Sequence, residues 1–160
     1  EGIEFPYGKF SEDLFTIYKT ILKSRSITYI GFDGYFYYYR DEGSIVVSGY
    51  KKKHLEALDA VDDIEESVKG KGRFDNALST QYINVIYDIA ARNPLLSEFR
   101  NKRIQNNLKA HRMSVLKDSN APKRLRGFAA ISLLGNRIVL KVVVARNRRW
   151  KVQRRETKKR

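Results

Sequence analysis

The spacing of apolar residues predicts an amphipathic helix near the start of the chain. Between Leu14 and Leu22 the apolar positions recur every three or four residues, which places them on one face of a helix. Ser11 precedes them as a candidate N-cap, and the two acidic residues that follow it favour a helix N-terminus. We therefore expect a helix over residues 11–24.

The pattern then changes from helical to alternating. Three short runs rich in aromatic and β-branched residues, at 27–32, 35–40 and 44–49, are separated by Asp33-Gly34 and by Asp41-Glu42-Gly43. Runs of this composition favour strands, and Asp-Gly pairs favour hairpin turns. The sequence predicts a three-stranded β-meander here.

Three more helices are expected after the meander. Residues 52–69 alternate an apolar side with an acidic side and end at Gly70-Lys71-Gly72, while Ser79 is a candidate N-cap for a helix at 80–92. The latter is apolar around most of its surface, which is typical of a buried helix. A fourth helix is predicted at 95–117 after Pro94, with a bend near Asn106-Asn107. Its apolar stripe is Ile104, Leu108, His111 and Val115.

The end of the chain is predicted to form a sheet. A loop at 118–126 leads to strands at 128–134 and 137–146, which are joined by Gly135-Asn136, a typical two-residue hairpin turn. A third strand is expected at 149–155, where apolar and basic residues alternate. The predicted fold class is α+β: an N-terminal helix, a β-meander and two helices, followed by a basic helix and a C-terminal three-stranded antiparallel sheet.

The charge distribution divides the chain into two expected modules. The 160 residues carry a formal net charge of +14. Residues 93–160 contain twenty Lys/Arg and three Asp/Glu, a net charge of +17, so residues 1–92 are mildly acidic. A strongly cationic module that also folds suggests a polyanionic partner, and nucleic acid is the commonest of these.

The cationic side chains of the second module form the candidate nucleic-acid-binding site. Basic groups on a helix, two turns and a strand face could follow a phosphate backbone, with each neutralised phosphate releasing counterions. The candidate residues are Arg100, Lys102, Arg103, Lys109, Arg112, Lys123, Arg124, Arg126, Arg146, Arg148, Arg149, Lys151, Arg154 and Arg155.

These features favour a non-enzymatic protein that binds double-stranded DNA largely independently of sequence, in the manner of nucleoid-associated or phage-type host-takeover proteins. Two alternatives stay open: a structured-RNA or ribosome-associated protein, and an adaptor or inhibitor that binds an acidic protein. A winged helix would instead read bases through residues 100–103, with 95–117 as recognition helix and Gly135-Asn136 at the wing tip. The strands of that wing are too apolar for an exposed hairpin, so we favour diffuse backbone binding.

The first module, residues 1–92, is the candidate for self-association or for a protein partner. Its aromatic residues could form a protein-binding patch, since tyrosine is enriched in interfaces, or could stack on unpaired bases. The acidic face of helix 52–69 is either solvated, a contact for a basic partner, or an internal contact with the cationic module of the same chain.

Little in the sequence favours catalysis. The chain has no cysteine and only two histidines, His54 and His111, which argues against thiolate chemistry and zinc sites. The three carboxylates of the basic module are not spaced to hold a metal. We expect no catalytic residue, metal or cofactor. No apolar run approaches the roughly 20 residues that span a bilayer, so we expect an intracellular protein, cytoplasmic or at the nucleoid, without a membrane partner.

Overall fold

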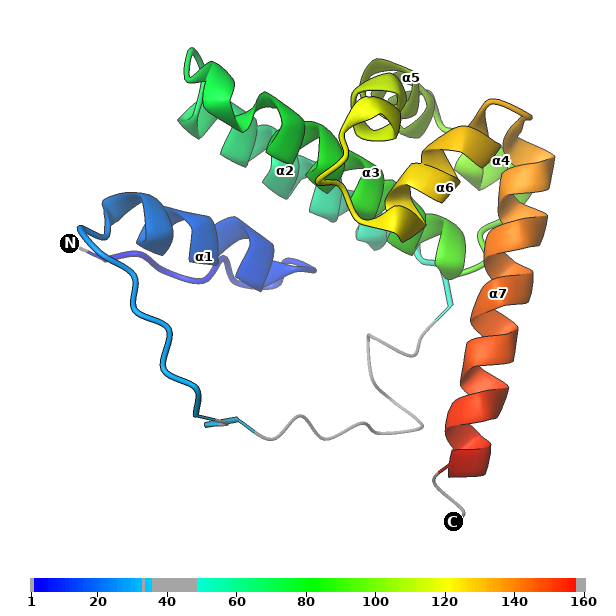
Figure 1. Ribbon diagram of the computed structural model, residues 1–160, viewed down its shortest axis with the longest axis horizontal. Coiled ribbons are helices and arrows are strands. Elements are labelled where there is room, and N and C mark those ends of the chain that lie inside the picture. Colours follow the sequence, from blue (N-terminus) through cyan, green and yellow to red (C-terminus); the bar gives the residue numbers. More distant parts are fainter. Residues whose placement is uncertain (1, 33, 36–48, 158–160) are drawn as a thin grey trace.

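The described part of the chain is entirely helical. The computed structural model describes residues 2–32, 34–35 and 49–157, with side chains as far as residue 147. Within these ranges no strand forms, so the predicted α+β class is wrong (Figure 1). The elements are α1 (Glu12–Lys23), the 3-10 helix η1 (Lys52–Leu55), α2 (Glu56–Ser67), the 3-10 helix η2 (Gly72–Phe74), α3 (Asp75–Ala91), α4 (Leu96–Phe99), α5 (Lys102–Lys117), α6 (Lys123–Ser132) and α7 (Asn136–Thr157).

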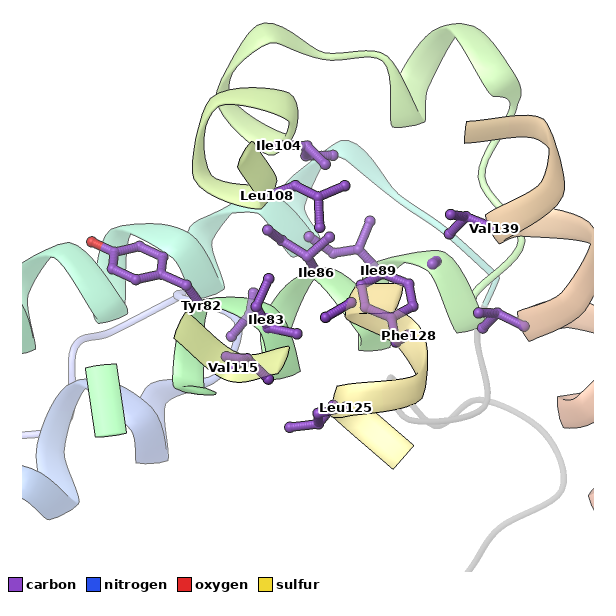
Figure 2. Packing of buried hydrophobic residues seen from close by; sticks show 14 of the residues in the cluster. Tyr82, Ile83, Ile86, Ile89, Ile104, Leu108, Val115, Leu125, Phe128 and Val139 are labelled. Atoms are coloured by element: carbon purple, nitrogen blue, oxygen red, sulfur yellow. The ribbon is translucent and has the colours of Figure 1, made fainter. Parts of the chain in front are cut away.

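Helix α3 is the centre of the fold. Its sequence is apolar around most of the cylinder, and such a helix must be covered on several sides. Helices α2, α5, α6 and α7 all pack against it. Their side chains converge on one interior in Figure 2, which includes Ile86 of α3, Leu108 of α5 and Phe128 of α6. This core extends from Leu58 in α2 to Val143 in α7 and so contains residues from both the acidic and the basic segments.

The predicted C-terminal strands 128–134, 137–146 and 149–155 are helical instead. The run after Gly135 has apolar residues both two and four positions apart. Its pattern is therefore compatible with a strand and with a helix. In the structure Val139 and Val143, one turn apart, are buried at 0% and 3% exposure, whereas Ile138 and Val142 are 42% and 41% exposed. Burying a valine contributes about 1.5–3 kcal/mol, which outweighs a helix-propensity cost of at most about 0.7 kcal/mol per residue.

The turn at Gly135-Asn136 is real, but it joins two helices. Gly135 adopts a φ of +106°, a region in which a residue with a Cβ is strained, and it ends α6. Helix α7 starts at the next residue. The expected loop at 118–126 is also shorter than predicted, because α6 begins at Lys123.

The part of the predicted meander that lies within the described residues does not form strands. Residues 27–32 adopt no regular structure and expose their apolar side chains. The other two expected strands, 35–40 and 44–49, lie mostly outside the described residues. The helix before them is confirmed: α1 occupies most of the predicted range 11–24, although the Ser11 side chain makes no capping hydrogen bond.

The helices of the middle region are predicted correctly, but some of their boundaries are not. Helix α2 and Gly70, with a φ of +76°, agree with the expected helix and its end. Helix α3 begins at Asp75, so Ser79 lies inside it rather than at its N-cap. The break in the fourth helix comes at Arg100-Asn101 and not at residues 106–107. There the Asn101 side chain accepts a hydrogen bond from the backbone N–H of Arg103 and caps α5.

Helix α1 is attached to α2 chiefly by polar contacts. The Tyr18 hydroxyl donates to Asp63 at 2.7 Å, and Lys19 forms an ion pair with the same carboxylate at 3.1 Å. The backbone N–H of Phe10 donates to Glu56 at 2.8 Å. Only Thr16 of α1 is buried. The predicted apolar stripe of α1 is therefore only partly covered by the described residues.

Substitution at the centre of α3 should strongly destabilise the domain. We expect Ile86→Ala to lower the free energy of unfolding by about 2–5 kcal/mol, because it leaves a cavity where four helices meet. Ile17→Ala, at a side chain that is 53% exposed on α1, should cost no more than about 0.5 kcal/mol. Urea denaturation followed by circular dichroism measures both. Equal losses for the two variants would contradict the central role of α3.

Candidate nucleic-acid interface

The structure places the predicted binding residues on three helices and one connection. Residues 148–155 lie in the last turns of α7, and their side chains are outside the described set. The remaining nine have described side chains, and they differ in exposure and in the partners they contact. Arg100 connects α4 and α5; Lys102, Arg103, Lys109 and Arg112 lie in α5; Lys123, Arg124 and Arg126 lie in α6; Arg146 lies in α7.

Arg103 is engaged by carboxylates of the N-terminal half. Its two terminal guanidinium nitrogens donate to Asp59 and Asp62 of α2, one to each. Burial alone would lower the pKa of Arg103, but these hydrogen bonds raise it overall. The contact supports one of the alternatives left open for the acidic face of α2, an internal contact with the cationic segment. Arg103 therefore joins α5 to α2 and is not available for phosphate.

Arg112, Arg124 and Arg126 have partly structural roles. The Nε atoms of Arg112 and Arg126 are buried and have no hydrogen-bond partner among the described residues. Arg124 donates to Asn84 of α3 at 3.0 Å and lies 5.6 Å from the centroid of the Tyr87 ring. Arg124 nevertheless remains exposed to solvent. These stems pack against the fold while charge is kept at its surface, as long cationic side chains commonly do.

The exposed and unengaged members of the predicted set are Arg100, Lys102, Lys109, Lys123 and Arg146. Three more exposed cations, Lys117, Arg137 and Lys141, have the same character and were not predicted. Two of these, Arg137 and Lys141, lie four residues apart on α7 and fall within the predicted strand 137–146. Reading residues 136–146 at a period of 3.6 instead would have placed both on one outer face.

Two hydrogen bonds bring the basic face of α5 to the α6–α7 turn. Arg112 donates to the carbonyl oxygen of Ser132 at 3.4 Å, and Asn136 donates to the side chain of Gln105 at 3.0 Å. Positions 105, 109 and 112 lie on one helical face, so exposed Lys109 is on the side of α5 that meets this turn. Arg137 then follows at the start of α7. We call Lys109, Arg112, Arg137 and Lys141 the turn cations.

The charge of the helix N-termini reverses between α4 and α5. The first turns of α1, α2, α3 and α4 contain acidic residues, as the helix dipole favours. Those of α5, α6 and α7 contain none. They begin with basic residues instead: Lys102 and Arg103 in α5, Lys123, Arg124 and Arg126 in α6, and Arg137 in α7. Apart from Arg103, which Asp59 and Asp62 compensate, each such cation is unfavourable by roughly 0.3–1 kcal/mol, and an external anion at these ends would relieve that cost.

A polar cluster behind Arg103 fastens α2, α3 and α5 together. The Tyr82 hydroxyl lies 2.7 Å from carboxylate oxygens of both Asp62 and Glu65. The His111 ring stacks on Tyr82 with centroids 4.2 Å apart, and its Nδ1 lies 3.1 Å from the Ser79 hydroxyl. His111 thus lies at the core boundary, as predicted from the stripe of α5. Burial lowers the pKa of His111, against the opposing effect of the two carboxylates.

In the described ranges no group of three or more His, Asp or Glu side chains is arranged to hold a metal ion. Among the helices described, none combines the length and apolar content required to cross a bilayer. Comparisons with protein-family models, with curated proteins and with solved structures give no match.

Neutralising the two carboxylates that hold Arg103 should affect stability and anion binding in opposite directions. We expect Asp59→Asn with Asp62→Asn to cost about 1–2 kcal/mol of stability, a charged hydrogen-bond contribution reduced by solvent screening. The same double variant should bind an added polyanion more tightly, because a guanidinium becomes free and two negative charges are removed. Urea denaturation and fluorescence anisotropy measure the two effects.

The matched comparison is Glu66→Gln, a neutralisation on the exposed part of α2 that leaves Arg103 paired. It should change stability and affinity less than the double variant. A double variant as stable as the wild type would show that the Arg103 contact does not contribute to the stability of the fold.

Acidification should destabilise the fold through its two histidines. Burial lowers the pKa of both His54 and His111 below the ordinary 6.5. Between the lowered pKa and 6.5 the unfolded chain binds more protons, so stability falls as the pH decreases through this window and is constant above it. Unfolding midpoints measured at about pH 7.5 and 5.5 test this. His111→Gln should reduce the pH dependence, and an unchanged dependence in that variant would remove His111 as a cause.

Proposed function

We propose that this chain binds double-stranded DNA through its phosphate backbone, with little dependence on base sequence. One observation carries the proposal. Of the twelve Lys/Arg between residues 93 and 147, where side chains are described, only Arg103 forms an ion pair. Uncompensated like charges repel one another across a folded surface, and a polyanion relieves that repulsion.

The charge pattern at the helix ends supports an anionic ligand. Free backbone N–H groups and a positive dipole end favour a phosphate at a helix N-terminus, and nearby Lys/Arg side chains add to this preference. Helices α5, α6 and α7 combine both features in their first turns, whereas α1 to α4 do not.

Helix α7 suits an extended contact along a duplex. Its 22 residues correspond to a length of about 33 Å at 1.5 Å per residue, close to the roughly 34 Å of one turn of B-DNA. Basic residues occur along all of it, from Arg137 to Arg155. A long cationic helix can contact several successive phosphates, which is the mode expected for binding of low sequence specificity.

The helical C-terminal region changes the mechanism expected from the sequence. Residues 146–155 contribute phosphate contacts from a continuous helix and not from a turn and a strand. The winged-helix alternative is also wrong, because residues 128–146 form α6 and α7 and provide no wing. Base readout by residues 100–103 is further disfavoured, since Arg103 is held by α2.

Structured RNA offers the same phosphate chemistry and is the principal alternative ligand. The acidic half would provide a separate contact for a protein partner or a second copy of the chain. Ile17, Ile21 and Leu22 of α1 are more than two-fifths exposed, and Ile27 to Phe32 expose further large apolar groups. Tyrosine and large aliphatic side chains of this kind suit a protein interface.

Fluorescence anisotropy with unrelated duplexes, single strands and duplex RNA tests the proposal. If six to ten phosphates are engaged, affinity for duplex DNA should fall by about 10³–10⁵-fold between 50 and 200 mM salt. Unrelated duplexes should bind alike. A flat salt response would exclude the mechanism, and a clear preference for duplex RNA would replace DNA by RNA as the ligand.

Single cation deletions locate the interface within the same assay. Lys109→Ala and Lys141→Ala should each reduce the slope of log affinity against log salt by about 1. Lys23→Ala, which removes the same charge from α1 in the acidic half, should leave the slope unchanged. Equal effects at all three positions would mean that net charge matters and a defined surface does not.

A further inference from the structure

The α6–α7 turn exposes an apolar surface within the most cationic part of the molecule. Leu133 and Leu134 are 51% and 67% exposed at the point where α6 gives way to α7, seen in orange in Figure 1. Ile138 and Val142, one turn apart on α7, expose further apolar groups a few residues later in the chain. Single exposed apolar residues are ordinary, but four of them within ten residues concentrate exposed apolar surface at this turn.

Basic side chains lie close to this turn. The hydrogen bonds of Arg112 with Ser132 and of Asn136 with Gln105 hold the turn against α5. They bring Lys109 and Arg112 of α5 close to the turn, and Arg137 and Lys141 follow it on α7. In the described residues no acidic side chain forms an ion pair with any of these four turn cations. The two leucines thus lie beside uncompensated positive charge.

The turn is short and is anchored on both sides. α6 ends at Ser132, Gly135 reverses the chain with a φ of +106°, and α7 starts at the next residue. The buried side chains of Phe128 before it and Val139 after it anchor both helices in the core. Leu133 and Leu134 are therefore displayed at a fixed position between two packed helices, and not on a long loop.

From this juxtaposition we infer that Leu133 and Leu134 insert between base pairs of the bound DNA and kink the duplex. The inference rests on the proposed function. The turn cations would hold the phosphate backbone, which brings the apolar turn to the adjacent groove. Partial unstacking costs free energy, and it is offset by burial of the leucines and by the further phosphate contacts that a bent duplex makes with α7.

The turn cations are the reason for choosing DNA as the ligand of this surface. A duplex presents negative charge beside an apolar stack of bases, which matches positive charge beside an apolar turn. An anionic lipid surface shares part of this chemistry, and it is distinguished below.

Fluorescence resonance energy transfer across an end-labelled duplex of about 30 base pairs measures the bend. Wild-type protein should shorten the end-to-end distance, and Leu133→Ala with Leu134→Ala should abolish the shortening. The double variant should keep its salt slope, with affinity reduced by about tenfold or less. A duplex with a central mismatch, which is easier to unstack, should bind wild type more tightly than the intact duplex, and the double variant should lose this preference.

Two control variants separate insertion from unrelated effects. Leu133→Met with Leu134→Met keeps apolar groups of similar size and should retain the bend. Ile17→Ala with Ile21→Ala removes exposed apolar groups from α1 and should also retain it. Because all these positions are exposed, thermal unfolding should change little, which confirms that each variant is folded.

Three results would overturn the inference in distinguishable ways. Tight, salt-dependent binding without a bend, or a bend that persists in the double alanine variant, would exclude insertion while leaving backbone binding in place. Absence of duplex binding at about 50 mM salt would remove the proposed function and the insertion with it. Leucine-dependent binding to phosphatidylserine vesicles, with duplex binding unaffected by the double variant, would assign the turn to a lipid surface.

Discussion

Burial of α3 is the constraint on which the remaining structure depends. A helix with apolar residues on nearly every side is stable only when other helices cover it, and α2, α5, α6 and α7 do so. Each covering helix turns its apolar residues inward, as Val139 and Val143 do on α7. The charged residues of these helices are consequently left on the outside. The cationic surface is thus a consequence of how the core is enclosed.

Electrostatic asymmetry persists when the chain folds because the two halves use their charges differently. The carboxylates of α2 are largely engaged inside the molecule: Asp59 and Asp62 contact Arg103, and Asp63 contacts Lys19 and Tyr18. The cations of α5, α6 and α7 have few such contacts among the described residues. In the folded chain the α2 carboxylates are paired with other groups, whereas most of the described cations of α5, α6 and α7 are not. This arrangement favours binding of an external polyanion.

The sequence was sufficient for the helices in which one face differs clearly from the other. Helices α1 and α2 and the burial of α3 follow from periodicity alone. The run at 137–146 was misassigned because its apolar residues occupy both faces, so a strand and a helix fit equally well. Its β-branched residues then favoured a strand. What decided the outcome was packing of Val139 and Val143 in a core built from distant segments, which no local pattern contains.

The sequence predicts the positive charge of the candidate site, but not which of its cations are exposed and which are engaged by other residues. The concentration of Lys/Arg after residue 93 is visible in the sequence. The pairing of Arg103 with Asp59 and Asp62 cannot be identified from the sequence, because it joins residues more than forty positions apart. Arg137 and Lys141 were omitted for the same reason that the strands were predicted. The correct helical period would have identified them.

The central claim is that duplex DNA binds the surface of α5, α6 and α7, and a nuclear magnetic resonance titration tests it most directly. Amide shifts recorded during addition of a short duplex should change at Lys109, in the first turn of α6 and along α7, and should change little in α1 and α2. Changes centred on α1 and α2, or no changes at low salt, would contradict the account.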